Sequence, residues 1–176
     1  MAATKIVKQI QKYQNWACRK VKIPNTNVLA LPTTGIEIVA AAGANKILLP
    51  VFCFFQLVWS ADYTNIDAGA TLGIQTGTSG KSVLAVIDNA LSTSVEGLLA
   101  GGASALAFAG IAGFYDPAGM AVAAIGGVSN LLDTDLANDS LIVKASNGGA
   151  GNFTGGNALN NLYCTVYYLT INLETV

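Results

Sequence analysis

Few residues of this chain have the types and the spacing that catalysis or ligand binding requires. The segment from Gly73 to Ser82 reads G-I-Q-T-G-T-S-G-K-S, and its end looks like a phosphate-binding loop. Such a loop needs another glycine five positions before Gly80, but Gln75 stands at that position. We therefore interpret these residues as a turn and predict no nucleotide site.

A group of acids lies further along the chain. Asp133, Asp135 and Asp139 include the D-x-D spacing with which calcium loops begin. The glycine and the distal glutamate of an EF-hand loop are missing, so we predict a solvated loop and no metal site. Paired carboxylates also act as acid and base in hydrolysis, but nothing in the sequence places these three acids in a cleft.

The chain contains no histidine, which removes the commonest general base and the commonest metal ligand. A nucleophilic serine or cysteine therefore lacks its usual partner. Cys18, Cys53 and Cys164 are odd in number and widely spaced, and we interpret them as free thiols in a reducing compartment. We predict no enzymatic activity, no catalytic residue, no cofactor and no small-molecule substrate.

The composition indicates a chain that associates with other chains. Hydrophobic residues make up 52% of its 176 residues and charged residues only 11%, against about 25% in an ordinary soluble domain. The net charge of −1 gives little repulsion between copies. We therefore expect partners to cover much of the surface, and the length suits one domain.

The first 22 residues carry the strongest charge asymmetry. They contain no acid and six of the nine basic residues, namely Lys5, Lys8, Lys12, Arg19, Lys20 and Lys22. The apolar residues between them fit either a short helix or an extended arm. We predict that this arm binds an acidic partner surface, with a solvated terminal segment as the alternative. Six scattered charges are too few for a nucleic-acid tail, and the apolar run of a secretory signal is missing.

The most hydrophobic window with many β-formers is Lys46–Trp59, K-I-L-L-P-V-F-C-F-F-Q-L-V-W. Its 14 residues are too few to cross a membrane as a helix. We predict a strand buried on both faces, with Phe52, Phe54, Gln56 and Val58 on one face and Cys53, Phe55, Leu57 and Trp59 on the other. Pro50 favours an edge position or a bulge in this strand.

Shorter strands are expected at residues 36–39 and 71–76, each bounded by turn residues. The segment Ser82–Leu99 has helical spacing of its apolar residues and a serine that caps its start, so it predicts a helix. The chain then runs uncharged from Gly97 to Gly113. Five glycines and the lack of flanking basic residues argue against a membrane span, and small residues also suit close packing between subunits.

The last third of the chain predicts β-structure most clearly. Residues 141–173 contain a short apolar strand, a loop rich in glycine and asparagine, and a returning aromatic strand, which we interpret as a hairpin. The expected fold is mainly β. It is a jelly-roll-like β-sandwich over residues 23–176, with one short helical segment and an extended or helical arm over residues 1–22.

Two segments carry a resemblance to a known group. Leu29–Ile47, L-A-L-P-T-T-G-I-E-I-V-A-A-A-G-A-N-K-I, resembles a segment of small virion proteins of tailed bacteriophages, cyanophages among them. That segment has the form L-x-L-x-T-x-P-I-x-L-V-P-A-P-G-A-G-K, and its prolines are replaced here by Gly35, Ala40 and Ala42. Val143–Tyr168 also resembles this group, and the two segments cover about a quarter of the chain.

The resemblance implies a jelly roll or similar sandwich, often trimeric, attached to a phage particle. The expected function is that of a capsid cement protein on the capsid exterior, made in the host cytoplasm, with the major capsid protein and its own copies as partners. One alternative is a structural subunit of the tail, neck or baseplate. Another is a surface carbohydrate-binding module, with Trp16, Trp59 and Tyr63–Asn65 as a stacking platform.

Overall fold

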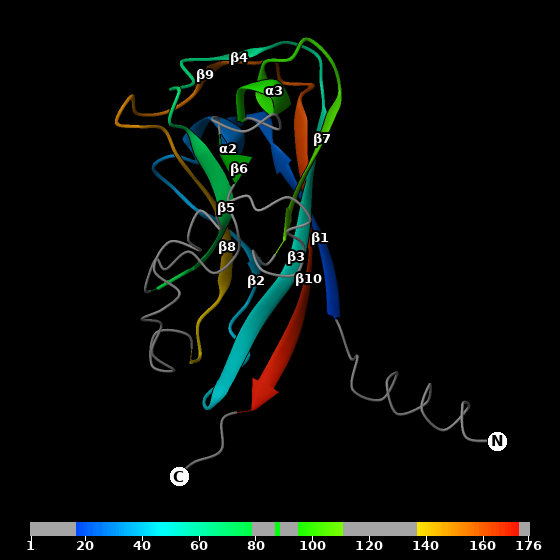
Figure 1. The fold of residues 1–176 in the computed structure, drawn as a ribbon, viewed down its shortest axis with the longest axis vertical. Coiled ribbons are helices and arrows are strands. Elements are labelled where there is room, and N and C mark those ends of the chain that lie inside the picture. Colours follow the sequence, from blue (N-terminus) through cyan, green and yellow to red (C-terminus); the bar gives the residue numbers. More distant parts are fainter. Residues whose placement is uncertain (1–16, 79–86, 89–94, 111–136, 173–176) are drawn as a thin grey trace, which may run out of the picture.

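The computed structural model describes residues 17–78, 87–88, 95–110 and 137–172. They form a mainly β structure in which two four-stranded antiparallel sheets pack face to face (Figure 1). The expected β-sandwich is confirmed. Two short helices, α2 (Asn25–Ala30) and α3 (Val95–Leu99), lie at one end of the layers.

The first sheet has the strand order β1-β10-β3-β7 and the second sheet has the order β2-β8-β5-β6. The strands of the first sheet are β1 (Ala17–Pro24), β10 (Asn161–Asn172), β3 (Lys46–Val58) and β7 (Ala105–Gly110). Those of the second sheet are β2 (Ile36–Val39), β8 (Leu141–Ser146), β5 (Thr71–Thr76) and β6 (Ile87–Asp88). A small third sheet joins β4 (Tyr63–Thr64) to β9 (Thr154–Gly155).

The core lies between the two layers and follows from the alternation of side chains along each strand. In the first sheet every second residue points inward and is buried: Cys53, Phe55 and Leu57 on β3, and Leu162, Cys164 and Val166 on β10. In the second sheet the inward set is Leu72 and Ile74 on β5, and Leu141, Val143 and Ala145 on β8. Burial of this apolar surface stabilises the pairing of the sheets.

The predicted strand over residues 46–59 is confirmed as β3, and so is the effect of Pro50. Tyr167 pairs with Phe52 whereas Tyr168 pairs with Pro50, so Val51 is an extra residue that forms a bulge. The prediction of burial on both faces is wrong. Phe52 and Phe54 are half-buried and Gln56 is exposed, because β3 belongs to a two-layer sandwich and only one of its faces meets the core.

The predicted strands at residues 36–39 and 71–76 are confirmed as β2 and β5. The predicted hairpin over residues 141–173 is wrong. Its two strands form, but β8 pairs with β2 and β5 in the second sheet, and β10 pairs with β1 and β3 in the first. The loop between them crosses from one layer to the other, where its β9 pairs with β4.

Within the described residues, the helix predicted over Ser82–Leu99 forms at its end, as α3. Ile87 and Asp88 pair with β5 as a strand, and the remainder of the predicted helix lies outside the described residues. The uncharged segment from Gly97 contains the end of α3 and the strand β7. In the described part of the chain, no helix is long and apolar enough to cross a membrane. The helix α2 was not predicted, because Asn25–Asn27 has the composition of a turn.

Two substitutions on β3 test which of its faces meets the core. Phe55 is fully buried, so Phe55→Ala should lower the free energy of unfolding by about 3–5 kcal/mol. Phe52 lies on the other face and is half-buried, so Phe52→Ala should cost about 1–2 kcal/mol. Urea denaturation measures both losses, and equal losses would contradict a strand with one core face.

Candidate functional site: the outer face of the first sheet

The structure brings together half of the cationic residues predicted to bind a partner. Arg19, Lys20 and Lys22 are exposed on β1, which is an edge strand of the first sheet. The predicted boundary between an arm over residues 1–22 and a sandwich from residue 23 therefore needs correction, since β1 begins at Ala17 and pairs with β10 over its whole length. Lys5, Lys8 and Lys12 lie outside the described residues.

Three rows of residues cross the outer face of this sheet, and each follows from the strand registers. The registers place Lys22 opposite Tyr163 and Tyr163 opposite Gln56, which pairs with Leu106 of β7. The second row starts with Lys20, Thr165 and Phe54, and the third with Cys18, Tyr167 and Phe52. Because alternate residues share a face, the surface changes from basic at β1 through aromatic on β10 and β3 to aliphatic at Leu106.

The side chains on this outer face contact one another across the strands. The ammonium of Lys20 lies 4.8 Å from the ring centroid of Tyr163, which is the geometry of a cation–π contact. The ring centroid of Phe52 lies 6.0 Å from that of Phe54 and 5.9 Å from that of Tyr167. Tyr167 forms a hydrogen bond with the Cys18 thiol, and this bond raises the pKa of the Tyr167 phenol. The negative charge of the ionised thiol acts in the same direction.

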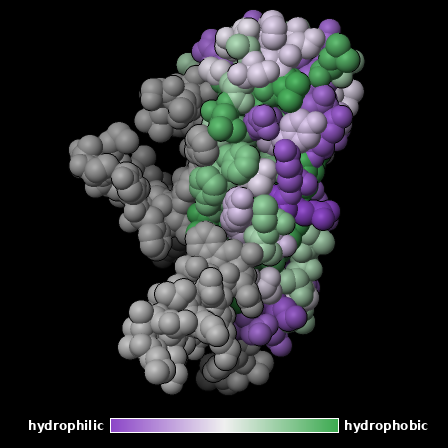
Figure 2. All heavy atoms as spheres, turned by 90° about the vertical axis from the view of Figure 1, so that its right-hand side faces the viewer, coloured by the Kyte–Doolittle hydropathy of each residue, from purple (hydrophilic) through white to green (hydrophobic). Residues whose placement is uncertain are grey.

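Figure 2 views this side of the molecule, where hydrophobic and hydrophilic residues lie side by side at the surface. Leu106 is 49% exposed and Val58 is 41% exposed, whereas Thr165 in the middle row is almost fully buried. None of the residues in the three rows is an acid. In the described part of the chain, no carboxylate pairs with Arg19, Lys20 or Lys22.

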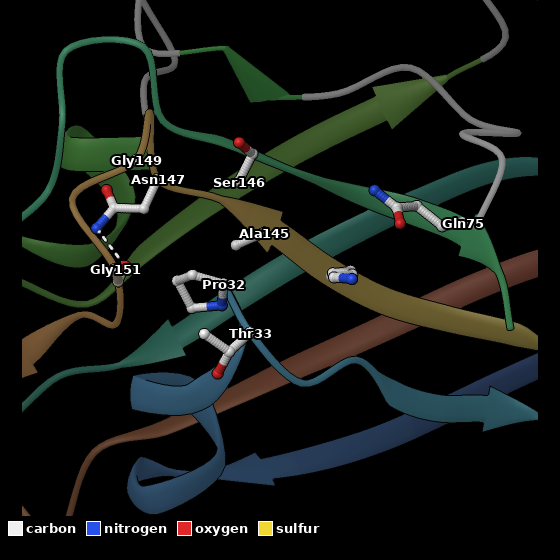
Figure 3. A pocket seen from close by; sticks show the side chains of 9 residues that line it. Pro32, Thr33, Gln75, Ala145, Ser146, Asn147, Gly149 and Gly151 are labelled. Atoms are coloured by element: carbon white, nitrogen blue, oxygen red, sulfur yellow. Dashed lines mark hydrogen bonds between the residues drawn. The ribbon is translucent and has the colours of Figure 1, made fainter.

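The second sheet carries a hollow of about 410 Å³ on its outer side (Figure 3). It lies between the turn at Pro32 and Thr33 and the glycine-rich loop after β8. The Thr33 hydroxyl donates to the Asn152 side-chain oxygen, and the Asn147 amide donates to the Gly151 carbonyl, so both side chains hold the loop in place. Lys144 is the one ionisable residue among those described as lining the hollow.

The acids and the glycine-rich segment considered for chemistry have structural roles where they are described. Asp139 is 6% exposed and accepts hydrogen bonds from the backbone N–H of Thr78 and of Ser140, so the prediction of a solvated loop is wrong for this residue. It fixes the turn after β5, which contains Gly77. Asp133 and Asp135 lie outside the described residues, within which no group of three possible metal ligands occurs.

The stacking platform expected for carbohydrate binding is wrong at Tyr63. This tyrosine is 1% exposed, because β4 places its ring in the core, so a sugar ring has no access to it. The indole nitrogen of Trp59 donates to an Asp62 carboxylate oxygen at 2.8 Å, and its half-buried ring packs against the core. Trp16 lies outside the described residues.

No protein-family description, no curated protein and no solved structure matches this chain. The outer face of the first sheet is therefore identified by its own geometry. Sequence reasoning placed Phe52 and Phe54 on one strand face but predicted that face to be buried. It did not join them to Tyr163 and Tyr167, although a spacing of four residues indicates that these two tyrosines also share a strand face.

The three thiols should differ sharply in reactivity. Cys18 is exposed, whereas Cys53 and Cys164 are buried in the core, where burial raises the pKa of the Cys164 thiol. A thiol-specific chromogenic reagent should therefore modify one cysteine in the folded protein and three in denaturant. The Cys18→Ser variant should lose only the fast reaction, and fast modification of a second thiol would contradict the inward position of Cys53 and Cys164.

Proposed function

We propose that this protein is a structural protein of a phage virion, a capsid cement or decoration protein that bridges neighbouring capsomers. A protein that binds only the assembled shell adds its binding free energy to the stability of that shell. This function requires a stable scaffold and contact surfaces, and it requires no catalytic group. The observation that carries the proposal is a partly exposed aromatic sheet face with a basic edge, on a chain of very low charge.

We further infer that the sandwich is a jelly roll, and the order of strand pairing supports this inference. Four strand pairs are nested, so that each pair lies between the two strands of the pair before it in the sequence: β1 with β10, β2 with β8, β3 with β7, and β5 with β6. Two further pairs, β3 with β10 and β5 with β8, join these strand pairs into two sheets. Jelly rolls of eight strands are common among viral capsid proteins.

The low charge supports an assembled state, because residues covered by partners need no polar surface. The two segments that resemble small virion proteins supply all of β2, the start of β3, part of β8 and most of β10. They therefore include long stretches of both sheets. A homotrimer attached to the major capsid protein fits these features best.

The first test is the mass of the purified protein in solution without detergent, measured by light scattering on a sizing column. We expect a trimer of about 54 kDa, three times the 18.0 kDa chain. The protein should also co-sediment with phage capsids in hundreds of copies per particle. A handful of copies would favour a tail, neck or baseplate subunit instead, and a monomer that ignores capsids would contradict the proposal.

The contribution of the basic residues can be divided at the start of β1. Deleting residues 1–16 removes Lys5, Lys8 and Lys12 without shortening any described strand. If these lysines meet an acidic capsid surface, the deletion should weaken particle binding at low salt and flatten its dependence on salt concentration. An unchanged salt dependence would assign the contact to the sandwich alone. The deleted protein should keep the thermal midpoint of the full chain.

A further inference from the structure

We infer that the outer face of the first sheet binds an acidic segment of a different virion protein, with carboxylates over β1 and apolar side chains over β3 and β7. This inference rests on the proposed function, because the partner is sought on the particle. It adds the chemistry of the partner and the residues that recognise it, namely Lys20, Lys22, Tyr163, Tyr167, Phe54 and Leu106.

The cations decide the charge of the partner. Lys20 and Lys22 stand at the edge of the aromatic rows, and Lys20 already lies over the ring of Tyr163. A partner that covers the aromatic rows removes water from these two ammonium groups, and a desolvated charge without a counter-charge is costly. The partner must therefore place carboxylates at this edge, where they also guide the docking orientation.

The same lysines argue that the partner covers the face and does not extend the sheet as an added strand. Charged side chains on an edge strand, lysines above all, hinder strand addition by another chain. Three consecutive positions of β1, Cys18 to Lys20, are exposed, and two of them are cationic. The large apolar groups lie on the face behind this edge, where Leu106 is the most exposed of them.

A second copy of this chain is a poorer source of the carboxylates. Three of its described aspartates already accept hydrogen bonds within their own chain. Asp62 accepts from the Trp59 indole and the Gly102 backbone, Asp67 from the Gly69 backbone, and Asp139 from the Thr78 and Ser140 backbones. These three acids hold turns and loops. Glu37 on β2 and Glu96 on α3 are exposed, but they stand singly on different elements, so an acidic segment of a different protein is the better counterpart of the paired Lys20 and Lys22.

Cross-linking on intact particles tests the partner directly. A zero-length carbodiimide joins a lysine amine to a carboxylate in contact with it, and mass spectrometry identifies the joined peptides. We expect Lys20 or Lys22 joined to an Asp or Glu of another virion protein. Lys46, which is exposed at the start of β3 and outside the three rows, serves as the control and should stay unjoined.

The outcomes separate the two proposals. Absence of the protein from particles overturns the proposed function and this inference together. Its presence with Lys20 and Lys22 unjoined, or joined only to another copy of this chain, overturns the inference and leaves the virion function standing.

Binding of purified variants to particles that lack the protein gives a second test. Lys20→Glu with Lys22→Glu should weaken binding by about tenfold or more, and the remaining binding should lose most of its salt dependence. Leu106 lies at the opposite side of the face. Leu106→Ser should weaken particle binding by about the same factor, and salt concentration should have little effect on this loss. Lys46→Glu should bind like the natural protein. All four substituted positions are exposed, so each variant should melt like the natural protein. Full binding by the double variant would overturn the inference.

Discussion

The pairing of β3 with β10 is the constraint on which the rest of the structure depends. It is the longest ladder of the described chain, with Asn161–Asn172 against Lys46–Val58, and it lies at the centre of the first sheet. Side chains alternate along a strand, so a shift by one residue would move Cys53, Phe55 and Leu57 out of the core. The same shift would bring Phe52, Phe54 and Gln56 inward. One register thus defines both the core and the outer face.

The bulge at Val51 allows that ladder to continue past Pro50. Proline has no backbone N–H and weakens any continuous ladder, and an extra residue restores the pairing beyond it. Beyond the bulge the opposite set of β3 residues turns inward, with Leu48 and Pro50 buried. The β10 set is unchanged, so Tyr168 packs against the core while Tyr167 stays on the outer face. The outer aromatic cluster therefore ends where the bulge begins.

The crossings between the layers depend on side-chain amides. Where the chain leaves a sheet its backbone loses ladder partners, and buried backbone groups must find others. Asn160 accepts from the N–H groups of Ser60 and Ala61 and donates to the Ala61 carbonyl, all within 3.1 Å. In the loop after β8, the Asn147 side chain accepts from the Asp67 N–H and donates to the carbonyls of Asn65 and Gly151. Gly155, with a φ of +74°, approaches the Asp62 carbonyl so closely that a side chain there would clash.

This division explains what the sequence predicted well and what it missed. Local alternation and turn residues were enough for β2, β3 and β5, and Pro50 was enough for the bulge. Whether β8 and β10 pair with each other is a non-local question, and a loop of glycines and asparagines suits a hairpin and a crossing equally. Whether one face of β3 is buried or both faces are depends on the number of layers in the fold. The spacing of apolar residues along the strand does not indicate that number. Ile87 and Asp88 fit a helical pattern, but pairing with β5 overrides it.

The placement of charge follows from the same need of the backbone for hydrogen-bond partners at turns and loops. In a chain with only ten acids, three of the described aspartates bind backbone N–H groups at turns, where an ionised oxygen forms strong hydrogen bonds. The cations of β1 have no such internal role, since a lysine cannot accept a hydrogen bond from an N–H group. The sandwich therefore uses these aspartates for its own turns and leaves Lys20 and Lys22 of β1 beside an aromatic surface. A nearly neutral chain thereby acquires a locally basic, apolar face without any excess of basic residues.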